Sequence, residues 1–425
     1  MKDKSIKLST ESYKGVRDFY PQDFYVQEYI FNTWKKAVHS FGYEEYNASI
    51  LENTDIYAAK SGQELVNEQT YTFTDRGERQ VTLRPEMTPS LARMVAAKKR
   101  ELPFPLRLFS IPNCFRYERP QRGRMREFWQ LNVDLLTKKP SPRYDVEILQ
   151  VVARIMDSFG AKKSDYTINL NSRAFLEVLY KEYYGFAEAS ALAFQKLTDK
   201  KNKISPEVFE AEYIKICEEA GVEKKSLISL SNQADIETLK ENPNIKEALE
   251  SVLNTIDLAQ KAGVTNIVFD ENTVRGLDYY TGIVFEVYDT DTQNNRALFG
   301  GGRYDNLVDI FEGPADEQTI SGIGFGIGDV PMMNFLETRG LLPAYKAKTD
   351  ILVGVIDESE STLAYVDEVA QQLRSEGKNI AVQYTSKKYG DVSTLAKKLG
   401  AKSMIVIGEN EAVEKKFEIK DVVLQ

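Results

Sequence analysis

The stretch Arg116 to Asp134, RYERPQRGRMREFWQLNVD, carries the pattern that decides the fold. It opens on Arg-x-Glu and runs through a turn that holds four further arginines: Arg119, Arg122, Arg124 and Arg126. Upstream, Cys114, Arg116 and Glu118 share one face of an extended segment. Two strands joined by an arginine-rich turn predict a hairpin. A solvated hairpin with a charged tip is the plain alternative.

The second strand of this hairpin alternates with period two. Its apolar face carries Trp129, Leu131, Val133 and Leu135, and its other face carries Phe128, Gln130, Asn132 and Asp134. The apolar face can pack on a core. The polar face suits a ligand better than it suits core or open solvent. Because arginine binds phosphate in a bidentate manner and an aromatic ring can stack on a base, the hairpin indicates an anionic, ring-bearing ligand such as a nucleotide.

Composition excludes several classes of chemistry. The chain has 425 residues, which suggests two or three domains, and its net charge of −9 argues against nonspecific coating of nucleic acid. Its single histidine, His39, lies in a predicted helix, so no Ser-His-Asp triad and no histidine-based metal site is expected. Two cysteines, no apolar run long enough to span a membrane and no secretory signal together predict a reducing cytoplasm and no membrane partner.

Periodicity divides the chain into three regions. Residues 21–41 are predicted helical, and a hairpin is expected from strands at 69–74 and 80–83. Helices are predicted from residue 88 and over 145–159, and residues 172–263 indicate a helical insertion. Strand character returns over 267–328. After a linker at 341–348, the order β-α-β-α-β in residues 349–425 predicts a small α/β domain with a partly parallel sheet.

Four further motifs have the residue types of a binding site. TLRPEMT at 82–88 places Arg84, Glu86 and Thr88 on one face, where a carboxylate and a hydroxyl suit an ammonium group. VRGLDYYTG at 274–282 sets two tyrosines after Arg275. FGGGRYD at 299–305 and GIGFGIG at 322–328 carry glycines that permit close backbone approach. An ion pair, tyrosine packing and a tightly packed core strand are the structural alternatives.

Taken in this order, the motifs resemble those of the class II aminoacyl-tRNA synthetases and, within that class, of the histidyl-tRNA synthetase family. KGVRDFYP at 14–21 resembles the family's N-terminal signature, and FRYERP with GRMREFWQ resembles motif 2. RGLDYYTG and GGGRYD resemble the two histidine-specific motifs, and GIGFGIG resembles the glycine-rich part of motif 3. The resemblance covers nearly the whole chain.

The resemblance implies an α+β catalytic domain at 1–340 with an antiparallel sheet of six or seven strands, the insertion, and an anticodon-binding domain at 349–425. It implies a homodimer that uses ATP and Mg²⁺ to activate L-histidine and then transfers it to tRNA(His). Arg116 and Arg275 would act at the α-phosphate, and Glu118, Arg124 and Phe128 would also bind ATP. Histidine would be bound by Arg116 and by Glu86, Thr88, Gln130, Asp134, Tyr279, Tyr280 and Tyr304. Arg119 and Gln121 would face the acceptor end of the tRNA.

Three positions depart from the family pattern. GIGFGIG continues as Asp329-Val330-Pro331, with no arginine, where motif 3 normally ends in Glu-Arg. Either another cation substitutes, with Arg303 and Arg296 nearby in sequence, or adenylation is impaired. Ser49 stands where motif 1 usually has a proline. Asp134 stands where many relatives have glutamate. A noncatalytic paralogue that senses histidine or tRNA, or serves as a regulatory subunit, is therefore the alternative to an active ligase.

Overall fold

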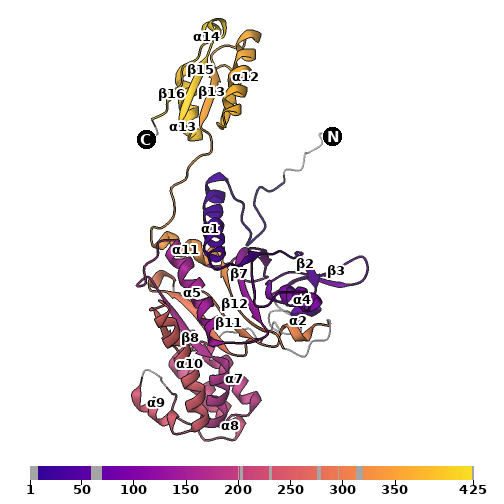
Figure 1. Cartoon of the computed structure of the whole chain (residues 1–425), viewed down its shortest axis with the longest axis vertical. Coiled ribbons are helices and arrows are strands. Elements are labelled where there is room, and N and C mark those ends of the chain that lie inside the picture. Colours follow the sequence, from indigo (N-terminus) through magenta and orange to yellow (C-terminus); the bar gives the residue numbers. More distant parts are fainter. Residues whose placement is uncertain are drawn as a thin grey trace, which may run out of the picture. The chain divides into compact units, whose positions relative to one another are not determined.

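The computed structural model describes residues 8–58, 69–199, 201, 204–228, 232–274, 279–294, 296–312 and 319–423. The chain forms two compact units, Met1–Leu342 and Pro343–Gln425 (Figure 1). Within the described ranges no helix is both long and apolar enough to cross a membrane.

A mixed sheet organises the first unit. Its nine strands run in the order β1 (Glu44–Glu45), β5 (Leu106–Ser110), β7 (Glu127–Thr137), β12 (Ser321–Gly328), β11 (Ala297–Tyr304), β10 (Ile283–Asp289), β8 (Tyr166–Ser172) and β9 (Ile267–Phe269), with β6 (Asn113–Phe115) paired to β7. The outer pairs β1–β5 and β8–β9 are parallel, and the pairs between them are antiparallel. The expected antiparallel sheet is confirmed, although in the described residues it is wider than six or seven strands.

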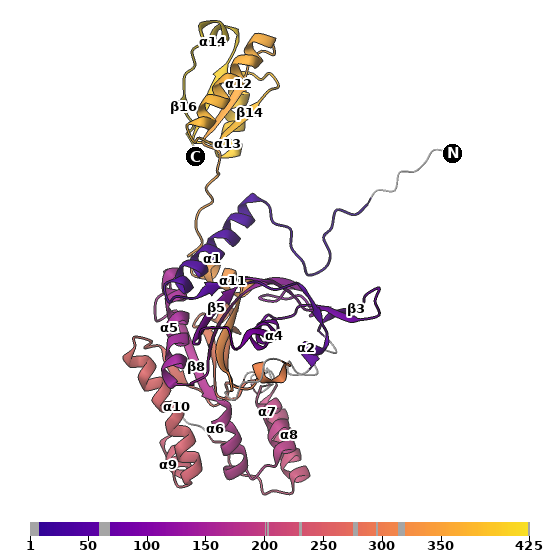
Figure 2. The same cartoon turned by 45° about the vertical axis from the view of Figure 1, so that its right-hand side comes forward.

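The main core lies on one face of this sheet. Helices α1 (Pro21–His39), α5 (Pro142–Ser158) and α11 (Asp329–Thr338) pack there, and Trp34, Leu149 and Phe335 are buried between them and the sheet. Helix α5 begins where it does because Ser141 accepts a hydrogen bond from the Arg143 amide and Pro142 occupies the first turn. Helix α4 (Thr88–Lys98) covers part of the opposite face, as Figure 2 shows.

Strand β7 follows the alternation read from its sequence. Leu131, Val133 and Leu135 are fully buried in the main core. Asn132 and Asp134 are buried on the other face. One face of the sheet thus packs on the main core, and the opposite face carries Asn132 and Asp134 of β7 beside a second, smaller apolar cluster.

A smaller three-stranded sheet precedes the motif 2 hairpin. Its strands lie in the order β2 (Leu51–Asn53), β4 (Gln80–Leu83) and β3 (Tyr71–Thr74). Helix α2 (Asp55–Ala58) packs against β2. The predicted hairpin of β3 and β4 is confirmed. Its turn is closed by Asp75, whose Oδ1 accepts from the amides of Gly77 at 2.8 Å and Arg79 at 3.0 Å.

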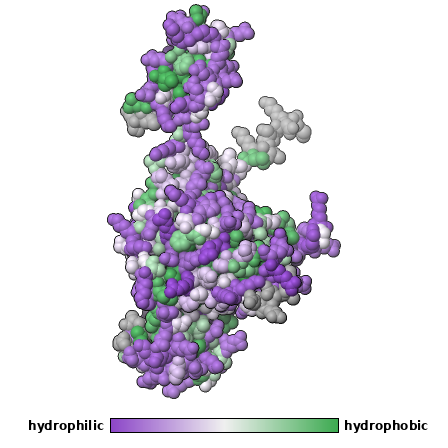
Figure 3. All heavy atoms as spheres, in the orientation of Figure 1, coloured by the Kyte–Doolittle hydropathy of each residue, from purple (hydrophilic) through white to green (hydrophobic). Residues whose placement is uncertain are grey.

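The helical insertion holds its own aromatic core. It contains α6 (Arg173–Val178), a π-helical turn (Leu179–Tyr183), α7 (Glu188–Asp199), α8 (Pro206–Ala220), α9 (Gln233–Lys240) and α10 (Pro243–Lys261). Tyr184, Phe194 and Tyr213 pack together, with ring centroids 5.0–6.1 Å apart. Helix α10 returns to the sheet and packs on α5 and β9. On the face drawn in Figure 3 the surface of α8 and α9 is mostly hydrophilic.

The second unit is the predicted α/β domain. Strands β14 (Ile380–Gln383), β13 (Ile351–Val355) and β15 (Ser403–Ile407) are parallel, and β16 (Lys420–Asp421) is antiparallel to β15. Helices α12 (Glu360–Ser375), α13 (Tyr389–Leu399) and α14 (Glu409–Glu414) complete it. Val353, Val366 and Ile405 are fully buried in a core that belongs to this unit alone.

Candidate active site

The floor of the site is the glycine-bearing face of β12. Strand pairing sets Gly324 beside Asp134 of β7 and Gly326 beside Asn132. A Cβ atom on Gly324 would lie 2.5 Å from Asp134 Oδ1, and one on Gly326 would lie 2.7 Å from Gln130 Nε2. The glycines are therefore required so that the polar side chains of β7 can lie across β12.

Three tyrosines close this end of the site. The Tyr304 hydroxyl donates to Asp134 Oδ1, and the Tyr279 hydroxyl donates to Glu86 Oε2 at 3.0 Å. Tyr279 packs edge-on against Tyr304 with ring centroids 5.8 Å apart, and its ring lies 5.0 Å from that of Tyr280. The structure thus brings Tyr279 and Tyr304, one from each of the two motifs that resemble the histidine-specific ones, next to Glu86 of TLRPEMT.

Three buried oxygens of this side-chain cluster have no partner in the described part of the chain: Glu86 Oε1, Asp134 Oδ2 and Asn132 Oδ1. Buried polar groups are normally hydrogen-bonded, so unpaired acceptors indicate the place of a ligand that donates. Two carboxyl groups among them indicate that this ligand is cationic. Burial raises the pKa of Asp134 from 3.8 to about 7; the hydrogen bond from Tyr304 opposes this shift and the charge of Glu86 adds to it.

Thr88 and Gln130 lie beside these acids. Thr88 is buried at the start of α4, and its Oγ1 accepts from Asn132 Nδ2 at 3.3 Å. The alternation of the strand predicts only that Asn132 lies on the polar face, and it assigns no ligand-binding role to this residue. Its buried, unpartnered oxygen adds it to the candidate ligand-binding residues, and its place in the alternation was the signal available.

The predicted hairpin forms the other end of the site. The Arg116 amide donates to the Arg126 carbonyl at 2.8 Å, which continues the β6–β7 pairing toward the turn. The Arg116 side chain donates through Nε to the Pro85 carbonyl at 3.0 Å, and its guanidinium carbon lies 5.3 Å from the centroid of the Phe128 ring. Arg116 thus lies between TLRPEMT and the aromatic ring proposed for the base.

The hairpin turn is charged and partly paired. Arg124 Nη1 bonds to Glu118 Oε2 at 2.9 Å, and the side chain of Arg124 remains 54% exposed. Arg119 and Gln121 are exposed, and Gln121 Oε1 accepts from Arg296 at 3.2 Å. The hairpin is therefore neither a free solvated tip nor a closed ion-pair cluster.

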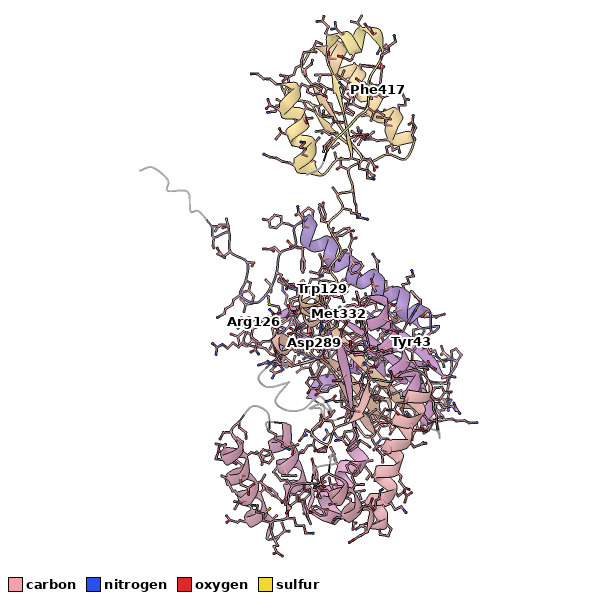
Figure 4. The ribbon with its side chains drawn as sticks, turned by 90° about the vertical axis from the view of Figure 1, so that its left-hand side faces the viewer. Tyr43, Arg126, Trp129, Asp289, Met332 and Phe417 are labelled. Carbon is pink, nitrogen blue, oxygen red and sulfur yellow. The ribbon has the colours of Figure 1, made fainter. Side chains whose placement is uncertain are left out.

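The N-terminal signature crosses the hairpin and ties it to motif 3. The Arg126 amide donates to the Gly15 carbonyl at 2.7 Å, and Figure 4 shows Arg126 and Trp129 beside this segment. Arg17 bonds to Asp329 Oδ2 at 2.7 Å. The other oxygen of Asp329 accepts from the Trp129 amide at 3.0 Å. Asp329 thus joins the N-terminal segment, motif 2 and the start of α11.

The predicted substitute Arg303 does not face the site. Its guanidinium forms a buried ion pair with Asp145 of α5 and also bonds to Ser321 and Asp305. Strand alternation points Arg303 to the face opposite Tyr304, so the idea that it supplies the missing motif 3 charge is wrong. Arg275, which sequence analysis placed at the α-phosphate, lies outside the described residues.

The described residues contain no group of three histidine, cysteine or acidic side chains able to hold a metal ion. Both cysteines, Cys114 and Cys217, are free and buried, and burial raises the pKa of Cys114 to about 12. Reactive-thiol chemistry is therefore not supported at either position.

A glycine-floored antiparallel sheet with a motif 2 hairpin on one side and buried acids on the other defines a class II aminoacyl-tRNA synthetase. A family model for histidyl-tRNA synthetase matches residues 15–330, and one for the anticodon binding domain matches residues 350–423. The chain belongs to the histidyl-tRNA synthetase family.

Similar proteins agree with this assignment. The histidine–tRNA ligase of Leptospira biflexa is 41% identical over 424 residues, covering 99% of this chain and 94% of its own length. That of Thermoplasma volcanium is 33% identical, covering 98% and 95%. The crystal structure of histidyl-tRNA synthetase from Nostoc sp. PCC 7120 shares the fold with a TM-score of 0.75 at 22% identity, covering 98% of this chain and 95% of that one.

Gly324→Ala tests whether the site requires a glycine in β12 beside Asp134. The added methyl group would collide with Asp134 and the β7 backbone. We therefore expect the free energy of unfolding to fall by about 1–3 kcal/mol and the affinity for histidine to decrease. Thermal unfolding with and without histidine measures both. Gly390→Ala is the control, because a Cβ there meets nothing within 4 Å. Unchanged histidine binding in Gly324→Ala would contradict the proposed floor.

Asp134→Asn tests the unpaired carboxyl. Because its pKa is raised to about 7 in the folded chain, the acid favours folding at low pH and loses this contribution as pH rises through 7. We therefore expect the ligand-free variant to gain stability relative to the parent as pH rises from about 4 to about 7, with no further gain above that, while histidine affinity falls by at least about tenfold. Melting temperatures across that range, with and without histidine, measure this. A stability difference that shrinks as pH rises would refute the assignment.

Proposed function

We propose that this chain joins L-histidine to tRNA(His) in two steps at the site between β7, β12 and α4. In the first, the histidine carboxylate attacks the α-phosphorus of ATP, and pyrophosphate leaves. In the second, a hydroxyl of the terminal adenosine attacks the carbonyl carbon, and AMP leaves. The observation that carries the proposal is the pair of buried acids, Glu86 and Asp134, on the same sheet face as Arg116 and Phe128.

The acid pocket suits histidine. The ammonium group has three donors, for which Glu86 Oε1 and Thr88 are suitable acceptors, and Gln130 can bind the carboxylate. Asp134 Oδ2 can accept from one imidazole nitrogen, while Tyr280 and Tyr304 complete the wall around the ring. Tyr279 acts through Glu86, since its hydroxyl already donates to that carboxylate.

The hairpin suits ATP. Phe128 provides a ring for adenine, with Glu118 near the amino group of the base, and Arg124 can reach the distal phosphates. Arg116 lies between Phe128 and Pro85, where it can bridge the histidine carboxylate and the α-phosphate. Arg275 is predicted to approach that phosphate from the other side. Magnesium fits as a partner of ATP rather than of a protein-only site, and it would neutralise phosphate charge.

The tRNA would contact two parts of the chain, the hairpin turn and the second unit. Arg119 and Gln121, exposed in the hairpin turn, would face the acceptor end. Residues 349–425 would bind the anticodon, with 341–348 as linker and 1–340 as the catalytic domain that carries the insertion at 172–263. The match of residues 350–423 to an anticodon binding domain supports this division.

We also propose a homodimer. Leu51 of β2 and Phe73 of β3 are 44% and 48% exposed, and Phe24 of α1 is 48% exposed. Exposed apolar residues, among them Leu51 two positions after Ser49 of the motif 1 stretch, suit an interface. Sedimentation equilibrium measures the mass: a monomer at micromolar concentration would contradict the dimer. The predicted location in the cytoplasm agrees with two free, buried cysteines.

The decisive experiment is histidine-dependent exchange of labelled pyrophosphate into ATP, followed by charging of tRNA(His). We expect both activities. Histidine binding without exchange would overturn the ligase and favour the noncatalytic sensor or regulatory subunit. Exchange with another amino acid at equal efficiency would overturn the histidine assignment instead.

Removal of the second unit tests the division of labour. Because each unit has its own buried core, a chain ending at Leu342 should fold, retain exchange and lose most charging of tRNA(His). The intact chain is the control, and circular dichroism verifies folding. Charging at the intact rate by the shortened chain would contradict the proposed role of residues 349–425.

A further inference from the structure

One exposed arginine lies at the edge of the site where three strand ends meet. Strand β12 ends at Gly328, which pairs with Gln130 near the start of β7. Strand β11 runs antiparallel to β12 and begins at Ala297. The start of β7, the end of β12 and the start of β11 therefore lie side by side. Phe128, Val330 and Arg296 are the residues found at or next to these ends.

The residues that follow GIGFGIG supply no positive charge at this edge. Val330 is 6% exposed in the first turn of α11, and Asp329 before it is paired with Arg17. Arg296, in contrast, is exposed, and its Nη2 reaches Gln121 Oε1 of the hairpin turn at 3.2 Å. Its charge thus lies against the same turn that carries Arg124.

The other arginines of β11 and of the segment just after α11 are already paired. Arg303 of β11 is bound to Asp145, and Arg339, just after α11, is bound to Asp289 and Asp165. No carboxylate within the described ranges forms an ion pair with Arg296. A cation that contacts a nucleotide-binding hairpin and has no acidic partner is suited to an incoming anion.

The 3-10 turn Thr292–Asn294, which lies just before Arg296 in the sequence, is held in place by hydrogen bonds. Asp289, labelled in Figure 4, ends β10 and accepts hydrogen bonds from Arg339 and from Asn294 Nδ2, the latter at 2.8 Å. Asn294 closes the 3-10 turn Thr292–Asn294 and also donates to Thr338 of α11 at 3.3 Å. Asn294, two positions before Arg296, is thereby held to both β10 and α11, which limits how far the attachment point of Arg296 can move when its side chain binds a ligand.

We propose that Arg296 binds the distal phosphates of ATP from the β11 side of the site, opposite Arg124 of the hairpin, and supplies the positive charge that the stretch after GIGFGIG lacks. The inference rests on the proposed function, because it assumes that ATP occupies the hairpin end. ATP carries several negative charges, so two arginines on opposite sides of the distal phosphates would neutralise and orient them while pyrophosphate leaves.

Arg296→Ala in the full-length chain tests this role. We expect the KM for ATP in histidine-dependent exchange to rise about tenfold or more, since a hydrogen bond to a charged group is lost. The KM for histidine should stay within about twofold, and Arg296→Lys should fall between parent and alanine variant. Arg154→Ala removes an exposed arginine of α5, on the rear of the sheet, and should change neither constant.

The double variant Arg296→Ala with Val330→Arg provides the sharper test. If ATP binding requires one cation at this edge, either after β12 or before β11, an arginine at position 330 should recover much of the ATP affinity. Calorimetry of ATP binding to Arg296→Ala gives a second readout should the double variant not fold. Equal increases in both KM values, or a raised KM only for tRNA(His) in charging, would overturn the proposal. Absence of exchange by the parent would instead refute the proposed function.

Discussion

The close approach of β7 to the side-chain-free face of β12 is the constraint on which the site depends. Asp134 and Gln130 can lie flat because Gly324 and Gly326 offer no Cβ. The same flatness lets Tyr304, one strand further on, reach Asp134 with its hydroxyl. A glycine-rich strand here is therefore not an open platform for a flat ligand. It is the space into which neighbouring strands extend their own polar groups, and those groups form the pocket.

This arrangement buries two carboxyl groups, each with an oxygen that accepts no hydrogen bond from the described residues. Glu86 and Asp134 are 3% and 1% exposed, and each keeps one oxygen without a partner in the described ranges. Hydrogen bonds from Tyr279 and Tyr304 satisfy only the other oxygens. Burial of an unpaired acceptor costs about 1–3 kcal/mol. A ligand that donates to both acids recovers that free energy on binding, so the cost is converted into affinity and selectivity for a cationic amino acid.

Sequence alone predicted the features that depend on local periodicity. The buried face of β7, the β3–β4 hairpin and the α/β order of the second unit follow from alternation and turn residues that lie within a few positions of one another. The sequence did not predict which partners the charged side chains bind, because those partners lie far away in the sequence. Arg17 meets Asp329 across 312 positions, and Tyr279 meets Glu86 across 193. Arg303 looked available beside a glycine run, yet Asp145, 158 positions away, binds it.

The distribution of arginines explains how such a site can still accept a polyanion. Those that fix the architecture, Arg17 and Arg303, pair with buried carboxylates, and removing one partner of such a pair is costly. The pair of Arg124 with Glu118 is different. Arg124 is 54% exposed, and exposed pairs contribute only about 0–1 kcal/mol. Phosphate can therefore displace Glu118 from Arg124 at small cost. The arginines that build the fold are held by burial, and those nearest the proposed nucleotide are held weakly enough to exchange partners.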